Sequence, residues 1–239
     1  MPPVLAPPSR FSHASTNRLT PHDLARFRGP WLFDAIGRAV CEAGCLPRKE
    51  LYEAWEMARR VRRRFRGGRI VDLAGGHGLL AQVLLLLDDT SPSALIVDTA
   101  VPPSAAALHQ VLVAAWPRLH ARVEFLAADL ERATIGVGDL VVSCHACGSL
   151  TDRVLTQAVR GRARVAVLPC CHETRPASPS PVGGWVDAAL AIDVSRAYGL
   201  AAQGYQVWTQ RIPPDITPKH RLLLGAPADA TAEEERAPA

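Results

Sequence analysis

The sequence lacks any long uninterrupted hydrophobic stretch. Its longest apolar run, Leu79 to Leu87, is broken by Gln82 and is far shorter than the ~20 residues that a membrane-spanning helix needs. The first residues, Met1 to Val4, also lack the basic segment followed by an apolar one that marks a secretory signal. We therefore predict a cytoplasmic protein without a membrane-spanning segment.

A strong charge of either sign is missing too. The formal net charge is +4 over 239 residues, which permits an acidic partner such as RNA without requiring one. Hydrophobic residues make up 48% of the chain and charged residues 21%, proportions typical of a soluble protein with one sizeable core. The six cysteines lie in three close pairs, and in a reducing compartment such thiols stay free or bind metal rather than form structural disulfides.

Composition divides the chain into four segments. Residues 1–19 start Pro-rich and residues 226–239 are rich in Ala, Glu and Pro, so we expect both to be disordered tails. Residues 20–66 are predicted to form a helical N-terminal extension, and residues 67–225 the main domain. No internal repeat divides the main domain further.

The N-terminal extension carries two helix signals. Thr20, Pro21 and Asp23 form a capping pattern, which predicts a helical region from residue 20 through Val40. A second helix is predicted over about 49–65, because its apolar residues recur three and four positions apart and share one face. Six arginines follow on its other face: Arg59, Arg60, Arg62, Arg63, Arg64 and Arg66.

From residue 69 the pattern changes to apolar strands separated by helical segments. Five strands are expected first, over Arg69–Leu73, Ala94–Asp98, Val123–Ala127, Asp139–Ser143 and Ala163–Leu168. This alternation indicates a parallel sheet covered on both faces. The last two strands, Tyr205–Arg211 and His220–Leu224, are joined by a connection too short for a crossover helix, so they should pair antiparallel. This order predicts the seven-stranded α/β, Rossmann-like fold of class I methyltransferases.

The loop after the first strand predicts a cofactor site. Asp72 lies at the end of the strand, and Gly75, Gly76 and Gly78 form a turn that opens a helix, where backbone can pass close to a ligand. The third glycine of the dinucleotide pattern G-x-G-x-x-G is missing. The spacing D-x-x-x-G-x-G fits an S-adenosylmethionine site better, with a purely structural tight turn as the simpler alternative.

Two further acidic residues mark the ends of the next strands. Asp98 ends the second strand, where a carboxylate can accept hydrogen bonds from both ribose hydroxyls of a nucleoside. Asp129 follows the third strand, where proteins of this fold place a side chain beside adenine. Each residue alone is more often a cap or turn residue. Together with the glycine loop, they predict S-adenosyl-L-methionine as the cofactor.

Cysteines and histidines cluster after the fourth and fifth strands. Ser143-Cys144-His145-Ala146-Cys147 follows the fourth strand, and Pro169-Cys170-Cys171-His172 follows the fifth. Because these strands should be neighbours, both segments are expected at the edge of the sheet where ligands bind. The pair of motifs, HACGxxTD and PCCH, resembles a methyltransferase domain shared by bacterial proteins, the methyltransferase-like 25 group and tRNA acceptor-stem 2′-O-methyltransferases.

The resemblance covers about residues 50–225 and includes Ile192-Asp193 and the segment from Ile216 to Arg221. It implies a class I fold, S-adenosylmethionine as cofactor and a methyl-transfer reaction. His220 stands where the resemblance leads us to expect Asn, and the zinc-binding modules of the tRNA enzymes are absent from this sequence.

Three roles are open for the Cys/His cluster. Zinc binding is one, but adjacent Cys170 and Cys171 point in opposite directions on an extended chain, so we predict no tightly bound metal. Attack of a cysteine on a pyrimidine ring is disfavoured, because the Pro-Cys follows the fifth strand. In the third role, His145 or His172 positions or deprotonates the acceptor, with Ser143 and Cys144 facing the transferred methyl group. Thiols that merely pack as small apolar groups are the remaining alternative.

Structured RNA, first of all tRNA, is the predicted acceptor. The motif pair resembles that of tRNA enzymes, and the arginines from Arg59 to Arg66 can contact phosphates. An arginine-rich helix end is, alternatively, a solvated face that suits the negative end of the helix dipole. Methylation of protein or a small molecule, a non-catalytic cofactor- or RNA-binding module, and a zinc- or redox-responsive protein are the rival functions. We expect no DNA or membrane partner, and the sequence sets no oligomeric state.

Overall fold

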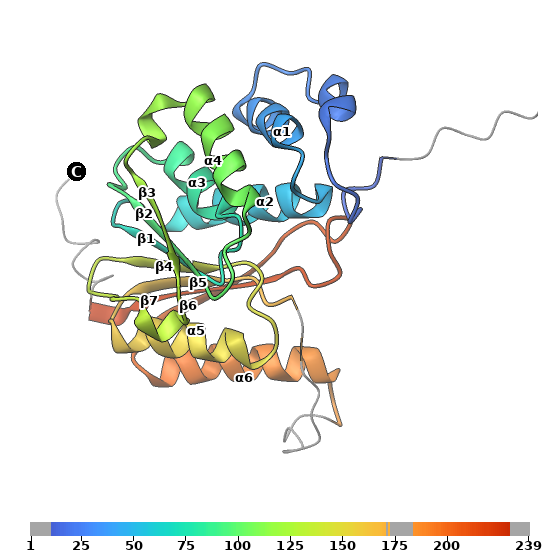
Figure 1. Cartoon of the computed structure of the whole chain (residues 1–239). Coiled ribbons are helices and arrows are strands. Elements are labelled where there is room, and N and C mark those ends of the chain that lie inside the picture. Colours follow the sequence, from blue (N-terminus) through green and yellow to red (C-terminus); the bar gives the residue numbers. More distant parts are fainter. Residues whose placement is uncertain (1–10, 171, 173–183, 230–239) are drawn as a thin grey trace, which may run out of the picture.

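A computed structural model of the chain describes residues 11–170, 172 and 184–229, in which a seven-stranded sheet lies between two layers of helices (Figure 1). The helices, with η for 3₁₀, are η1 (Pro21–Arg26), α1 (Leu32–Ala43), α2 (Arg48–Arg64), α3 (Leu79–Leu87), α4 (Ser104–Ala115), η2 (Pro117–Leu119), η3 (Leu130–Arg132), α5 (Ser149–Arg160) and α6 (Ala188–Ala202). The strands are β1 (Ile70–Leu73), β2 (Ala94–Asp98), β3 (Val123–Ala127), β4 (Leu140–Ser143), β5 (Arg164–Val167), β6 (Tyr205–Arg211) and β7 (Arg221–Pro227).

The sheet has the strand order β3-β2-β1-β4-β5-β7-β6. The first five strands run parallel, and β7 pairs antiparallel with both β5 and β6. The predicted fold class is therefore confirmed, including the antiparallel final pair. The order reverses between β1 and β4, and in such sheets ligands bind outside the carboxyl ends of the strands at this point.

The strand bounds agree closely with the sequence pattern. β2, β3 and β6 have the predicted limits, while β1, β4 and β5 are shorter by one residue at one or both ends. β7 extends beyond the predicted Leu224 to Pro227, because it pairs with β6 along its whole length, as far as Tyr205 opposite Pro227. The start of the expected C-terminal tail thus belongs to the sheet, and residues 230–239 lie outside the described residues.

Two hydrophobic cores lie on the two faces of the sheet, because alternate side chains of a strand point to opposite faces. Ile70 and Ile96 pack in the core under α1 to α4, whereas Val71 and Val97 pack in the core above α5 and α6 (Figure 1). Both faces are covered, which explains why the central strands are apolar throughout.

The N-terminal extension starts as predicted but is interrupted. The backbone N–H of Thr20 donates to Asp23 Oδ2 at 3.2 Å, which closes the expected capping box of η1. The single helical region expected through Val40 is wrong, because Gly29 and Pro30 separate η1 from α1. α1 ends at Gly44, which adopts the left-handed conformation with φ of 65°.

Residues 11–19, expected as part of a tail, pack against the turn between α1 and α2. Leu19 is fully buried and its N–H donates to the carbonyl of Leu46 at 2.9 Å. The guanidinium of Arg48 lies 3.6 Å from the centre of the Phe11 ring. These contacts attach the segment to the folded unit, and residues 1–10 lie outside the described residues. Of the helices that the structure describes, none is long and apolar enough to cross a membrane.

Candidate active site

The glycine-rich loop between β1 and α3 exposes backbone without side chains at the carboxyl edge of the sheet. Gly76 and Gly78 have positive φ of 52° and 70°, and the N–H of Gly76 donates to Asp98 Oδ2 at 3.0 Å. A Cβ on Gly75 would lie 2.9 Å from Cγ of Asp72, so only glycine fits there. A Cβ on Gly76 would instead meet nothing within 4 Å, so the space beside this backbone is open to a ligand.

Ala74 occupies a strained position in the same loop. It has a positive φ of 55°, a conformation that costs a residue with a Cβ roughly 1–2 kcal/mol. Its side chain lines two cavities at this edge of the sheet. Strain of this kind concentrates where a loop has to present groups to a ligand.

Asp72, the first predicted cofactor residue, is buried at the base of the loop. Its Oδ2 atom is buried and has no hydrogen-bond partner in the structure. Burial, with a smaller contribution from the charge of Asp98, raises the pKa of Asp72 to about 7. The backbone N–H of Ala81 donates to this carboxyl, and the unpartnered Oδ2 atom suits a ligand that brings a positive charge or a donor.

The first cavity has a volume of about 180 Å³ and contains two of the other predicted residues. It is lined by Ala74, Val97, Asp98, Thr99, Ala128, Asp129, Leu130, Leu150 and Arg153. Both carboxylate oxygens of Asp98 accept backbone hydrogen bonds, from Gly76 and Ala100, which fixes the carboxylate in place. The side chain of Asp129 is 68% exposed at the rim, 3.8 Å from Nη2 of Arg153.

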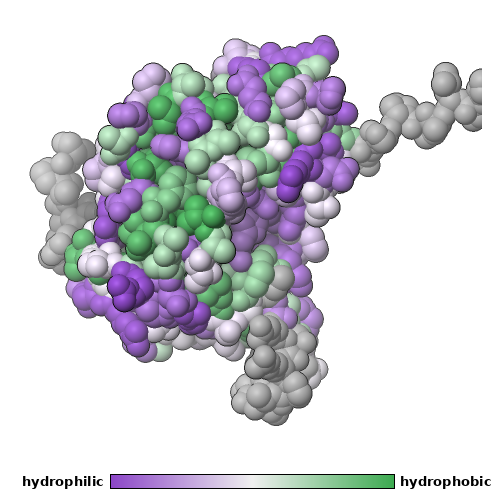
Figure 2. Space-filling model, in the orientation of Figure 1, coloured by the Kyte–Doolittle hydropathy of each residue, from purple (hydrophilic) through white to green (hydrophobic). Residues whose placement is uncertain are grey.

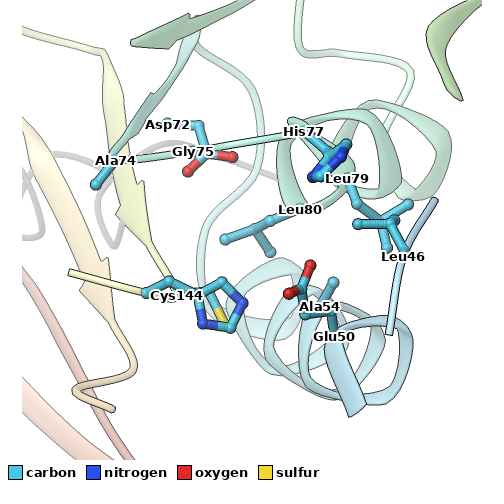
Figure 3. A pocket seen from close by; sticks show the side chains of 11 residues that line it. Leu46, Glu50, Ala54, Asp72, Ala74, Gly75, His77, Leu79, Leu80 and Cys144 are labelled. Carbon is cyan, nitrogen blue, oxygen red and sulfur yellow. The ribbon is translucent and has the colours of Figure 1, made fainter. Parts of the chain in front are cut away.

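The second cavity lies on the other side of Ala74, between the glycine loop, the end of β4 and the N-terminal extension. It is lined by Leu46, Glu50, Ala54, Asp72, Ala74, Gly75, His77, Leu79, Leu80, Cys144 and His145. Asp72 from β1 and Glu50 from α2 approach it from opposite sides (Figure 3). Its volume is about 30 Å³, little more than the space of a water molecule, so the extension closes the site.

Cys144 and His145 belong to this second cavity, as expected for two of the predicted catalytic residues. Burial, reinforced by the charges of Glu53 and Asp72, raises the pKa of the Cys144 thiol well above its usual range. The His145 side chain is 40% exposed, yet desolvation of the ring, with Lys49 nearby, lowers its pKa to about 4. Both side chains are therefore uncharged at neutral pH, and His145 offers a free lone pair.

The other two predicted catalytic residues lie elsewhere. Ser143 is buried at the end of β4 with its Oγ atom unpartnered, outside the lining of both cavities. The His172 Nε2 atom lies 2.7 Å from Oδ1 of Asp193 in α6, and Oδ2 of Asp193 accepts from Nε of Arg221 at 2.6 Å. His172 thus joins the end of β5 to α6 and β7, and does not line the cavity of Cys144 and His145.

Cys147 and Cys170 form a contact of their own beside Cys144. The sulfur atoms of Cys147 and Cys170 lie 2.9 Å apart, which joins the β4–α5 loop to the end of β5. The two segments therefore meet at one edge, as the neighbouring strands predicted. Cys171, the residue whose direction argued against zinc, lies outside the described residues.

The sequence reasoning missed two acidic residues of α2, Glu50 and Glu53. They are three positions apart and share the face of the helix that carries buried Ala54 and Met57. Burial raises the pKa of both carboxyls. The signal was available, because acidic residues within an apolar helical face are unusual. The periodicity of α2 did not reveal which segment this face of the helix contacts.

The arginines from Arg62 onward lie toward the opposite edge of the sheet, whereas Nε of Arg60 donates to the carbonyl of Arg211 at the carboxyl end of β6. Arg62 is buried and pairs with Asp88, with Nη1 and Oδ2 3.1 Å apart, in the connection that leads into β2. Arg64 stacks on Trp208, and the carbonyl of Arg66 accepts a hydrogen bond from Arg164. These contacts hold the C-terminal end of α2 to the amino ends of the strands. Contact of the cluster with RNA phosphates at the entrance of the site stays a prediction.

Comparison with known proteins agrees with this geometry. The sequence profile of a methyltransferase-domain family matches residues 49–175, more than half of the chain. The chain belongs to this family. It is an S-adenosylmethionine-dependent methyltransferase by family and has the class I, Rossmann-like fold. The match begins at the start of α2, so the helix that carries Glu50 and Glu53 is part of the family's domain.

Solved structures of methyltransferases resemble this chain at low sequence identity. A ribosomal protein L11 methylase from Lactobacillus delbrueckii subsp. bulgaricus is 15% identical with a TM-score of 0.49, over 73% of this chain and 76% of that one. A putative RNA methyltransferase from Pyrococcus horikoshii is 16% identical with a TM-score of 0.47, over 85% and 94%. An O-methyltransferase family protein from Burkholderia thailandensis is 17% identical with a TM-score of 0.45, over 86% and 66%. Among curated proteins, none matches this sequence.

The residues present fit the cofactor that the methyltransferase fold implies. The unpartnered Oδ2 of Asp72 can accept from an ammonium group, as the amino-acid end of S-adenosylmethionine carries. The fixed carboxylate of Asp98 lies in a cavity beside apolar Val97 and Leu130, a combination that suits a ribose with its base. Gly76, which lies between Asp72 and Asp98 in the sequence, has open space beside its backbone.

Proposed function

We propose that the chain transfers the methyl group of S-adenosyl-L-methionine at the carboxyl edge of β1, β2 and β4. The observation that supports this most directly is that Asp72 and Asp98 lie in two cavities that share Ala74. Asp98 and Asp129 would hold the nucleoside end, and Asp72 with Gly75, Gly76 and Gly78 the methionine end. When bound, the cofactor supplies an electrophilic methyl group on its sulfonium sulfur.

The chain's own contribution is mainly to align an acceptor with that methyl group. Cys144 and His145 line the same cavity as Asp72, so the acceptor atom belongs beside them. With a pKa of about 4, His145 is a poor proton acceptor at neutral pH, which makes it a positioning group rather than a general base. His172 acts further away, because its contact with Asp193 holds the ends of β5 and β7 together.

We propose structured RNA, with tRNA first, as the acceptor. The motifs around His145 and His172 support this choice through their resemblance to tRNA 2′-O-methyltransferases. The C-terminal arginines of α2 give it less support, because Arg62 and Arg66 contact groups at the other edge of the sheet. The surface beside the site favours a polar partner, since hydrophilic side chains gather over the N-terminal extension (Figure 2). Arg18 is exposed there. Burial, with a smaller contribution from the nearby charge of Arg18, lowers the pKa of His77, which lines the second cavity.

The cofactor assignment is tested by calorimetry with S-adenosylmethionine and its demethylated product. We expect binding to the wild-type protein and a loss of at least tenfold in affinity in Asp98→Ala. The control is Asp89→Ala, which removes an exposed carboxyl from the connection that precedes β2, at the opposite edge. Absence of binding to the folded wild-type chain would overturn the assignment.

The acceptor is tested by transfer of labelled methyl groups into a lysate of a strain that lacks the protein, divided into RNA, protein and small molecules. Label in the RNA fraction, and within it in tRNA, is the expected result. Label confined to protein or to small molecules would replace RNA by that acceptor class. In either case the cofactor assignment would stand, because calorimetry tests it separately.

The site of RNA contact is tested by two matched charge reversals. Phosphate contacts release counterions, so RNA binding should weaken steeply as salt is raised. Arg18→Glu, beside the site, should reduce RNA affinity and flatten this dependence. Arg63→Glu, on the exposed C-terminal turn of α2 at the other edge, should leave both unchanged. The opposite ranking would return the RNA contact to the arginine cluster.

A further inference from the structure

Three side chains with metal-binding atoms converge at the base of the second cavity. They are Glu53 from α2, and Cys144 and His145 from the segment after β4. One ligand atom from each, a carboxylate oxygen, Sγ and a ring nitrogen, lies within 4.8 Å of the other two. The three residues come from two segments that are about ninety positions apart in the sequence, so this convergence is a product of the fold.

Glu53 provides a second, independent observation. Its side chain is 2% exposed, and its Oε2 atom is buried with no partner at hydrogen-bond distance, although the buried hydroxyl of Thr217 lies near enough to lower the pKa of the carboxyl. The Oε2 atom lies 4.0 Å from Nε2 of His145, while Oε1 is occupied by Nζ of Lys49 at 3.2 Å. A buried carboxylate oxygen without a partner destabilises the fold unless a hydrogen-bond donor or a cation binds to it.

The donor set selects the kind of ion. A thiolate, an imidazole and a carboxylate together suit Zn²⁺, whereas Mg²⁺ and Ca²⁺ prefer oxygen ligands alone. With bonds of about 2.0–2.3 Å, ligand atoms around a tetrahedral zinc ion are about 3.3–3.8 Å apart. Closing the present separations needs a contraction of about an ångström, which His145, exposed over part of its side chain, can supply by a small rotation.

We propose that Glu53, Cys144 and His145 bind one zinc ion, with the fourth coordination position open toward the cavity that Asp72 lines. Three protein ligands and one open position are typical of zinc sites that bind a reactant. A hydroxyl or thiol of the acceptor would occupy the open position, where the ion favours loss of its proton to solvent. This role for the ion rests on the proposed function; the metal site itself does not.

The proposal revises the expectation that the chain binds no zinc. That expectation considered ligands from the two Cys/His segments alone, and adjacent Cys170 and Cys171 were unsuitable together. The site proposed here uses neither of them. Its third ligand comes from the N-terminal extension, which gives that extension a role in assembling the site as well as in closing it.

The test is titration of the chelator-treated full-length protein with Co²⁺, which substitutes for zinc and reports its ligands by absorption. We expect one equivalent to bind, with the visible bands of tetrahedral cobalt and a near-ultraviolet thiolate-to-cobalt band. Cys144→Ser should abolish the thiolate band, and His145→Ala and Glu53→Gln should each weaken Zn²⁺ competition at least tenfold. Cys41→Ser and Glu56→Gln, a buried thiol and a carboxylate from outside the cavity, are the matched controls and should behave as wild type.

Two outcomes would overturn the proposal. One is a wild-type protein that binds no cobalt with a thiolate band. The other is a band that survives Cys144→Ser and disappears in Cys147→Ser, which would assign the metal to the Cys147–Cys170 pair. If Cys144→Ser does not fold, His145→Ala decides, since that side chain is partly exposed. Calorimetry of cofactor binding to the metal-free protein separates this result from the proposed function.

Discussion

Both edges of the sheet contain buried polar groups that are paired, but among the described residues the buried side-chain atoms without a partner lie at the carboxyl edge. At the amino edge, Arg62 pairs with Asp88 at 3.1 Å and Arg69 with Asp139 at 2.7 Å. At the carboxyl edge, the buried atoms Asp72 Oδ2, Ser143 Oγ and Glu53 Oε2 have no hydrogen-bond partner. α2 takes part in both, with Arg62 near one end and Glu53 near the other.

Buried polar groups with a partner and those without one affect the protein differently. A buried group whose partner belongs to the chain stabilises the fold or is at least neutral, whereas a buried group without one destabilises it. Unpartnered groups gathered at one edge therefore indicate a place where a ligand is expected to supply the missing contacts. The following predictions test this comparison, from the largest expected effect to the smallest.

The largest effect is expected at the amino edge. Arg62→Met keeps the apolar stem of the side chain but removes the buried ion-pair partner of Asp88, itself 2% exposed. The exposed Arg66, 3.9 Å away, is then its remaining ion-pair contact. We expect the free energy of unfolding to fall by about 3–5 kcal/mol, measured by urea denaturation. Arg63→Met, at the exposed neighbouring position, should change it by less than about 0.5 kcal/mol. A cost below about 1 kcal/mol for Arg62→Met would mean that the pair does not hold this edge together.

At the carboxyl edge, removing a buried charge should stabilise the protein rather than destabilise it. The pKa of Asp72 is about 7 in the folded chain and near 4 when unfolded. Between these values the folded state binds more protons, so stability should fall as pH rises through this window and stay low above it. Asp72→Asn should remove this slope and raise the free energy of unfolding at pH 8 by roughly 1–3 kcal/mol, while cofactor affinity is lost.

Thermal unfolding of the two proteins across pH 4–8 measures the Asp72 effect without any ligand. A variant less stable than wild type at pH 8 would show that contacts within the fold, such as the backbone N–H of Ala81, stabilise the charged carboxyl more than burial destabilises it. Retained cofactor affinity in Asp72→Asn, with the slope removed, would instead separate its burial from its proposed binding role.

Two glycines allow the edges to be compared, because replacing either one should destabilise the backbone by a similar amount. Gly76, at the site, and Gly204, before β6 at the amino edge, both have positive φ and open space where a Cβ would project. Replacing either by Ala should lower stability by about 1 kcal/mol. Only Gly76→Ala should also weaken cofactor binding in calorimetry, because its methyl group would occupy the ligand's space. Equal binding losses in both variants would remove the distinction between the two positions.

The smallest effect is expected at two alanines with positive φ, Ala74 at the site and Ala121 before β3. Replacing either by Gly should relieve the strain and, after the added flexibility of the unfolded chain, raise stability by roughly 0.5 kcal/mol. Denaturant midpoints measure this change. Cofactor affinity should change in Ala74→Gly and stay constant in Ala121→Gly. Equal cofactor affinities in the two variants would contradict the difference that we expect between the two edges.

The sequence by itself determined the sheet and the position of the glycine loop. Apolar runs between helical segments predicted five parallel strands, and the short connection after Arg211 predicted the antiparallel pair, because each depends only on local pattern and connection length. The placement of Asp72 and Asp98 at one edge followed for the same reason, since strand ends are local features and parallel strands end together.

Only the tertiary structure decided which distant side chains meet. The rotation of α2 on the sheet brings Glu53 to Cys144 and His145, and its length carries Arg62 to the opposite edge. The packing of α6 gives His172 a partner in Asp193 and so separates it from the cavity where the sequence had placed it with His145. Such contacts depend on how whole elements pack against one another, and periodicity within a single element carries no information about the orientation of its neighbour.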